Sequence, residues 1–249
     1  MALETATSTR TVDIHRPLRL VALGDSTSCG EGVGVRVALD STWPALLAMA
    51  LRAEHVCFSR PGARVRDVLS EQLAPACAQR PDVVTLLIGL NDVLRSASCP
   101  TGAQLTAVLR PFRGSTALVA RLHDPTELLP LPRAARAAVL RRVGLFNAAV
   151  DEAVAATGAV LLDLAGLPEL RRRDAWAVDR LHPSAHGHAV IAAGATAALG
   201  LVGSPSTARA EQVSGRLAEL IWLTRHGLPY LAVHGGRLAP GALAALARC

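Results

Sequence analysis

Short apolar segments alternate with longer helix-like segments along most of the chain, and this alternation limits the fold more than any other feature. Five of the apolar segments read as buried strands, since they are short and rich in leucine or β-branched residues. They cover residues 18–23, 55–59, 83–88, 115–120 and 159–164. Strands that alternate with helices form a parallel sheet with both faces covered. The pattern therefore predicts an α/β fold on a five-stranded parallel sheet.

The intervals between these strands carry helix patterns. Helices are predicted at residues 43–53, 65–78, 103–112 and 133–157, and a further one begins near His186. Pro44 suits the first turn of a helix, because a proline there loses no helical hydrogen bond. Gly158 follows the longest pattern, as expected where a helix ends in a left-handed residue. The stretch from Asp124 to Pro132 contains three prolines and is predicted to be a loop.

The two ends of the chain differ in character from its central part. Residues 1–17 are polar, lack the apolar stretch of a signal peptide and are predicted to form an N-terminal arm. After a linker-like stretch, apolar residues recur at helical spacing at Val213, Leu217, Leu220 and Ile221. We expect one domain over residues 18–203 and a C-terminal helical extension over residues 204–249 that packs on it. A lid or a partner-binding arm is the alternative for this extension.

The basic residues exclude several functions. All 26 of them are arginine, which excludes a phosphate-loop lysine, a Schiff-base lysine and a Ser-Lys dyad. The net charge of +6 would suit nucleic acid. However, the arginines are scattered, and the few aromatic residues do not interleave with them into a stacking platform. We therefore expect solvated arginines and no nucleic-acid partner.

Cysteine spacing and hydropathy indicate a reduced, soluble protein. The five cysteines are widely spaced and form no CxxC pair, so neither a zinc site nor a disulfide framework is expected. The longest nearly uncharged apolar run, residues 189–203, is too short to span a bilayer. The sequence predicts a cytoplasmic protein without a metal or an organic cofactor, and it carries no indication of oligomeric state.

Polar or glycine residues follow three of the predicted strands at the point where each strand ends. Ser26 follows the first strand, where a helix would begin and leave backbone N–H groups unpaired. Gly62 follows the second, where a glycine lets a ligand approach the backbone closely. Asn91 follows the third, where an amide on a loop can donate to a developing oxyanion. Each has an ordinary alternative, as a helix cap or a turn residue.

A carboxylate and an imidazole lie three positions apart in the loop after the last predicted strand. Asp179 can reach His182 within one turn, which Pro183 fixes, and can orient the ring and stabilise its protonated form. A surface histidine beside a chance aspartate is the ordinary alternative. His186 and His188 fall at the start of the next helix and are weaker candidates. The carboxyl ends of parallel strands share one edge of the sheet, so these groups are expected to converge there.

Together these groups supply a nucleophile, a base with its orienting carboxylate and several oxyanion donors, as acyl transfer requires. They occur along the chain as four motifs: Gly24-Asp25-Ser26, Gly62, Gly89-x-Asn91-Asp92 and Asp179-x-x-His182. This order resembles the SGNH (GDSL-type) hydrolase superfamily over residues 18–200. The resemblance implies a flavodoxin-like three-layer α/β/α sandwich with strand order 2-1-3-4-5. The stretch beyond residue 204 is similar to extensions of actinobacterial members.

The resemblance also implies a role for each site residue. Ser26 would be the nucleophile, His182 the base and Asp179 the group that orients it. The N–H groups of Ser26 and Gly62 and the amide of Asn91 would form the oxyanion hole. The predicted activity is hydrolysis of a small-molecule carboxylic ester through an acyl-enzyme. An acyltransferase with the same intermediate, a non-catalytic binding protein on this scaffold and, less favoured, a Cys29 nucleophile are the alternatives.

Overall fold

The computed structural model describes residues 16–32, 35–128, 131–177 and 179–201. The predicted extension over residues 204–249 and all but the last two residues of the predicted N-terminal arm lie outside this part. Within it, one parallel sheet has the order β4-β1-β5-β6-β7, which is 2-1-3-4-5 along the chain, so the predicted fold is confirmed. The strands are β1 (Leu18–Gly24), β4 (Ala53–Cys57), β5 (Val83–Leu87), β6 (Thr116–Arg121) and β7 (Val160–Asp163).

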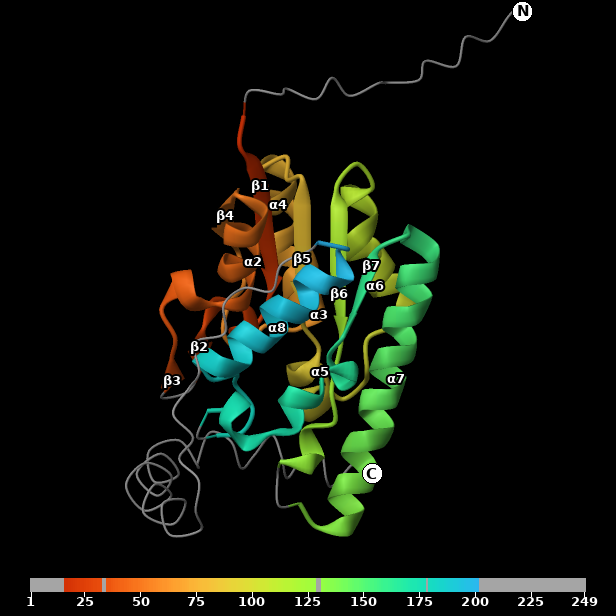
Figure 1. Cartoon of the computed structure of the whole chain (residues 1–249). Coiled ribbons are helices and arrows are strands. Elements are labelled where there is room, and N and C mark those ends of the chain that lie inside the picture. The colour runs from red at the N-terminus through yellow and green to blue at the C-terminus, as the bar shows by residue number, and fades with distance from the viewer. Residues whose placement is uncertain (1–15, 33–34, 129–130, 178, 202–249) are drawn as a thin grey trace, which may run out of the picture.

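Helices cover both faces of the sheet (Figure 1). On one face α2 (Trp43–Leu51) packs against α8 (Ala185–Ala198). The other face carries one continuous helical segment of three parts and two further helices that pack on one another. These are α3 (Val65–Asp67), the π-helical turn η2 (Val68–Gln72), α4 (Leu73–Ala78), α6 (Gly102–Leu109) and α7 (Arg133–Thr157).

Shorter elements line the edge of the sheet at the carboxyl ends of its strands or connect the longer ones. Two of them, α1 (Ser26–Cys29) and α5 (Leu90–Arg95), follow the two central strands directly. A small antiparallel pair is formed by β2 (Glu31–Gly32) and β3 (Val35–Arg36). The 3-10 turns are η1 (Leu39–Ser41), η3 (Arg110–Phe112), η4 (Pro125–Glu127), η5 (Leu164–Gly166), η6 (Pro168–Arg171) and η7 (Arg173–Ala175).

The central strands are apolar on both faces because helices cover both. Residues 20–23 of β1 and 83–87 of β5 are all buried, so these strands show a continuous apolar run instead of an alternating pattern. The largest fully buried side chains are Trp43 of α2 and Phe146 of α7, one from each helical layer. Apart from Trp43, Phe112, Phe146 and Trp176, the buried hydrophobic residues are aliphatic, so aliphatic packing forms most of this core.

Several predicted boundaries were wrong by a few residues. The helix expected over 43–53 ends at Leu51, because Arg52 adopts a left-handed conformation with φ 52° and β4 begins at Ala53. The loop expected to carry Asn91 is the helix α5. By contrast, α7 has the predicted bounds, and Gly158 caps it in the left-handed conformation. The boundary that Gly158 marks was thus predicted correctly, whereas the one that Arg52 sets was not.

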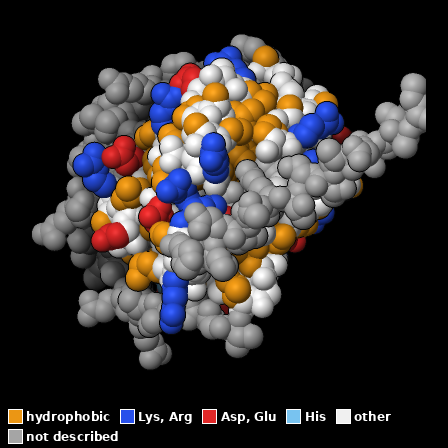
Figure 2. Space-filling view, turned by 90° about the horizontal axis from the view of Figure 1, so that it is seen from above, with side chains coloured by type: hydrophobic (Ala, Val, Ile, Leu, Met, Phe, Trp, Pro, Cys, Tyr) orange, Lys and Arg blue, Asp and Glu red, His pale blue; other side chains and the backbone are white. Residues whose placement is uncertain are grey.

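Figure 2 looks onto the end of the molecule at which β1 begins. Arginine side chains are spread over this end and mix with acidic and hydrophobic side chains, without one continuous basic patch. None of the helices in the described residues is long and apolar enough to cross a membrane.

Candidate active site

The chain reverses its winding direction between β1 and β5, so the carboxyl ends of these two strands mark a topological switch point. β1 is followed by β4 on one side, whereas the later strands are added on the other side of β1. In open α/β sheets ligands bind at this switch point. Ser26 follows β1 and Asn91 follows β5, so both lie at the switch point.

A tight turn carries Ser26 out of β1. Gly24 has φ 140°, and a Cβ there would lie 2.1 Å from the carbonyl oxygen of Leu87 on the adjacent strand, so only glycine fits. Asp25 caps α1, since its carboxylate accepts the N–H of Thr27 at 2.9 Å and the Thr27 hydroxyl at 2.6 Å. The turn therefore fixes Ser26 as the first residue of a short helix, with its side chain at the sheet edge.

Ser26, His182 and Asp179 form a continuous hydrogen-bonded chain. His182 Nε2 lies 2.8 Å from Ser26 Oγ, and His182 Nδ1 lies 2.5 Å from Asp179 Oδ2. The Asp179 side chain is 4% exposed and that of His182 is 15% exposed, so water reaches the imidazole but hardly reaches the carboxylate. The structure thus brings together three predicted residues that are separated by up to 156 positions.

The loop between Trp176 and Pro183 holds this arrangement. Asp179 Oδ1 accepts the backbone N–H groups of Leu181 and His182 at 3.0 and 3.1 Å. Trp176 and Pro183 form an isolated antiparallel bridge that closes the base of the loop. The Trp176 ring also stacks on His123 at 4.3 Å between centroids. Each of the two carboxylate oxygens of Asp179 is therefore engaged, which orients the group toward His182.

The pairing of Asp179 with His182 shifts the pKa values of both groups. Burial alone would lower the pKa of His182, but the hydrogen bond and charge of Asp179, together with the charge of Asp25, hold it above its ordinary value. Burial alone would raise the pKa of Asp179, but the bonds it accepts hold it below the ordinary value. The pair therefore favours a charged aspartate beside a histidine that binds a proton readily.

Backbone contacts bring Gly62 to the same point. The N–H of Arg60 donates to the carbonyl of Gly24 at 3.2 Å, and the carbonyl of Ala63 accepts from Asn91 Nδ2 at 3.2 Å. Gly62 lies between these two contacts with φ 76°, a conformation that favours glycine. In the described residues, neither its N–H nor that of Ser26 donates to a protein acceptor. Two of the three predicted oxyanion donors are therefore free for a ligand.

Asn91 lies beside these donors but its amide is already engaged. Its Nδ2 donates to Asp25 Oδ2 and to the carbonyl of Ala63, both at 3.2 Å. Both bonds are long for N–H···O bonds, so a ligand oxygen could compete for one of the two hydrogens. Asp25 was part of a predicted motif, but its contact with Asn91 was not predicted.

The weaker candidates do not join the site chemistry. His188 is buried, and its Nδ1 accepts the N–H of Trp43 at 3.1 Å. His186 forms no hydrogen bond with Ser26 in the described part of the chain. Burial raises the pKa of the Cys29 thiol to about 11, so the thiol stays protonated. Across the described ranges no group of acidic, histidine and cysteine side chains could hold a metal ion.

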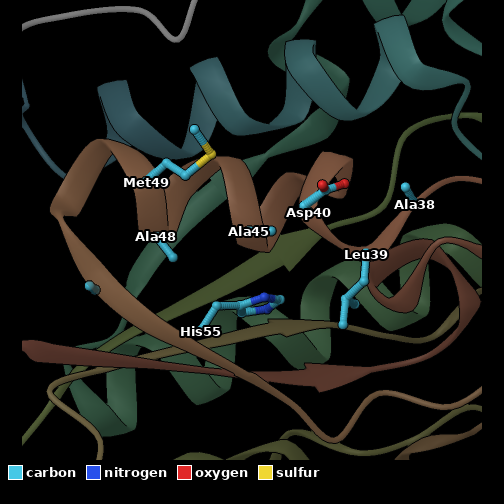
Figure 3. A pocket seen from close by; sticks show the side chains of 8 residues that line it. Ala38, Leu39, Asp40, Ala45, Ala48, Met49 and His55 are labelled. Atoms are coloured by element: carbon cyan, nitrogen blue, oxygen red, sulfur yellow. The ribbon is translucent and has the colours of Figure 1, made fainter.

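A pocket of about 550 Å³ lies away from these residues, between α2 and the edge strand β4. Figure 3 shows the His55 ring on β4 below Ala45 and Ala48 of α2, with Met49 at one end and Leu39 at the other. Its lining contains neither Ser26 nor His182. The pocket is therefore separate from the hydrogen-bonded chain at the switch point.

The chain matches the model of the GDSL-like lipase/acylhydrolase family over residues 22–190. This range contains Ser26, Gly62, Asn91, Asp179 and His182. None of the curated proteins matches the chain.

Solved structures of several enzymes share the fold. An α/β hydrolase, LAE5, from the metagenome of Lake Arreo, Spain, is 23% identical with a TM-score of 0.58, covering 75% of this chain and 97% of its own. The psychrotrophic esterase EstA from Pseudoalteromonas sp. is 20% identical with a TM-score of 0.56, covering 73% and 96%. The acetylxylan esterase Axe2 from Geobacillus stearothermophilus is 22% identical with a TM-score of 0.56, covering 74% and 94%.

Proposed function

The chain belongs to the GDSL-like lipase/acylhydrolase family, and from this premise we propose that it is a serine esterase that works through a covalent acyl-enzyme on Ser26. Its substrates would be small-molecule carboxylic esters. Of the alternatives, acyl transfer would use the same intermediate with an alcohol or amine in place of water.

In the proposed mechanism, Ser26 Oγ attacks the ester carbonyl carbon while His182 Nε2 takes its proton. His182 then donates this proton to the leaving alkoxide, and the acyl group remains on Ser26. A water molecule, deprotonated by His182, attacks the acyl-enzyme, and His182 returns this proton to Ser26 Oγ as the acid is released. Asp179 keeps the second proton of the imidazole on Nδ1 and stabilises the charged ring that forms in each half-reaction.

The developing oxyanion would be bound by three donors. The N–H groups of Ser26 and Gly62 have no protein acceptor in the described residues and are available without rearrangement. Asn91 would exchange one of its 3.2 Å bonds, to Asp25 or to Ala63, for a bond to the oxyanion. Donors that are held in place before the reaction lower its barrier, because they need no reorganisation in the transition state.

One observation carries the proposal: Ser26 Oγ is 2.8 Å from an imidazole whose other nitrogen is 2.5 Å from a buried carboxylate. A hydroxyl and a base within hydrogen-bond reach, with the base oriented by a third group, are the geometric requirements for an activated serine. Burying a carboxylate costs free energy unless it is paired, and here its partner is the imidazole that contacts Ser26.

The test is pre-steady-state hydrolysis of p-nitrophenyl acetate by Ser26→Ala, with fluorophosphonate labelling of the same protein. We expect neither a burst nor labelling. Ser28→Ala is the matched control, because Ser28 is two residues away and its buried Oγ has no partner in the described residues. Cys29→Ser tests the thiol alternative and should keep both signals. Wild-type turnover by Ser26→Ala would refute the proposal, and an ester product formed with added alcohol would favour acyl transfer.

A further inference from the structure

Arg95 stands on the same face of α5 as Asn91. The two residues are four positions apart in the helix Leu90–Arg95, and residues at this spacing are neighbours on a helix surface. Because Asn91 faces Asp25 and Ala63, Arg95 is on the side of α5 that faces the switch point.

The guanidinium of Arg95 also lies beside Gly62. A Cβ placed on Gly62 would be 3.5 Å from Arg95 Nη1, and apart from Gly62 and its two chain neighbours no other atom of the described residues lies within 4 Å of that point. The space in front of Gly62 is therefore open except for this one cation. A substrate held by the Gly62 N–H would therefore lie close to the guanidinium of Arg95.

Arg95 has no other evident task in the described residues. Its side chain is exposed and forms no ion pair with any described carboxylate. Nor does it cap α5, because Arg142 takes that role. The Arg142 guanidinium donates to the carbonyls of Val93 at 2.6 Å and of Asp92 and Ser96 at 2.9 Å. An unpaired cation beside Gly62, one of the proposed oxyanion donors, is thus available to a ligand.

We propose that Arg95 binds an anionic group of the substrate, so that the enzyme prefers esters that carry a carboxylate or a phosphate near the scissile bond. This inference rests on the proposed function and names its substrate class. A guanidinium is always charged and matches the two oxygens of a carboxylate or a phosphate with paired N–H donors. A neutral ester would offer the Arg95 guanidinium no anionic partner, and the guanidinium would stay hydrated.

The test compares matched esters that differ only in charge. One pair is the p-nitrophenyl esters of succinic acid and of its monomethyl ester, which place the charge on the acyl side. The other pair is acetylglycerol phosphate and acetylglycerol, which place a phosphate on the alcohol side. For each pair, the measured quantity is kcat/KM for the anionic ester divided by kcat/KM for the neutral ester. In the pair for which the wild-type ratio is higher, we expect Arg95→Gln to lower this ratio by about 10- to 100-fold. Arg95→Glu should lower it further.

Arg110→Gln is the control, since Arg110 is also exposed but lies at the start of η3, before β6 begins. It should leave both ratios unchanged. Ratios that stay at wild-type values in Arg95→Gln for both pairs would overturn the inference, while Ser26-dependent hydrolysis of the neutral esters would still support the proposed function. Absence of Ser26-dependent turnover on all four esters would overturn the proposed function and this inference together.

Discussion

Gln72 and Gly24 exchange two hydrogen bonds across the junction between the helical layer and β1. The N–H of Gly24 donates to Gln72 Oε1 at 2.9 Å, and Gln72 Nε2 donates to the carbonyl of Gly24 at 2.8 Å. Gln72 is 1% exposed and ends the π-helical turn η2, a feature that is frequent at functional sites. The Gln72 side-chain amide therefore pairs with the backbone N–H and carbonyl of Gly24, as a neighbouring strand would. Gly24 is the residue at which the turn to Ser26 begins.

Replacing Gln72 should disturb the position of Ser26 more than the binding of substrate. Gln72→Leu leaves the Gly24 N–H unpaired in the interior, so we expect kcat to fall by about tenfold or more with a smaller change in KM. In Gln72→Glu, a protonated carboxyl can still donate to the Gly24 carbonyl and accept its N–H. The ratio of variant to wild-type kcat should therefore decrease as pH rises and this carboxyl ionises. A ratio that is independent of pH in folded protein would argue against the positioning role.

Asp25 is expected to act through Asn91. Its Oδ2 accepts from Asn91 Nδ2, and Asp25→Asn would place a second amide N–H₂ group against that donor. Asn91→Ala should lower kcat by a factor on the order of 10²–10³, as expected for the loss of one oxyanion donor. Asp25→Asn should lower kcat by a smaller factor. In the Asn91→Ala background, Asp25→Asn should have little additional effect, since interacting residues are not additive. Burst kinetics on p-nitrophenyl acetate would measure the effect of each variant. Effects of Asp25→Asn and Asn91→Ala that multiply in the double variant would contradict the coupling.

The rate should depend on pH through His182. The base must be neutral to accept the Ser26 proton, so kcat/KM should fall as pH falls through the pKa of His182, which lies above its ordinary value. Asp179→Asn removes the main interaction that raises this pKa, because burial alone lowers it. We therefore expect the acidic limb of the profile to move to lower pH while the plateau value of kcat/KM decreases. The profile of kcat/KM against pH for a neutral ester measures both effects.

A control for this profile is Asp174→Asn. Asp174 also has a lowered pKa, mainly because of its hydrogen bond with Arg172. Among the described residues, however, it has no contact with the His182 ring. Its variant should keep the wild-type midpoint. A midpoint that stays in place in Asp179→Asn would show that the Asp179 carboxylate does not control the protonation of His182.

The strands and the site motifs were predictable because they depend on local pattern. Buried parallel strands require continuous apolar runs, and the residues at their carboxyl ends share one edge of the sheet whatever connects them. This is sufficient to bring Ser26 and Asn91 together. The pairing of Asp179 with His182 was predictable for a similar reason. Two residues that are three positions apart in a tight loop must lie close together in space.

Features that depend on contacts between distant segments were not predictable. Nothing in the local sequence around Gln72 indicates that the helix forms a π-helical turn there. Nor does it indicate that the Gln72 side chain bonds to Gly24. The helix α5 was missed because it is six residues long and begins directly after Gly89, which reads as a turn. The proximity of Arg95 to Gly62 follows from that missed helix, so the sequence contained no signal for it.

His188 contributes a pH dependence of stability that is separate from catalysis. Its Nδ1 accepts the N–H of Trp43, which begins α2, so the ring proton resides on Nε2. Burial, with a smaller effect of the His182 charge, lowers the pKa of His188 to about 4. Protonation of Nδ1 in the folded protein would break the bond to the Trp43 N–H and leave a charge in the interior.

The folded protein should therefore lose stability as pH falls. Below the ordinary histidine pKa the unfolded chain binds a proton at His188 that the folded protein rejects until about pH 4. The loss should reach about 3 kcal/mol at the bottom of this window. His188→Gln can still accept the Trp43 N–H but cannot titrate, so urea unfolding at about pH 7 and about pH 5 should show a smaller loss. The pKa of His123, which burial also lowers to about 4, affects both proteins alike. Equal losses in the two proteins would mean that His188 does not couple folding to pH.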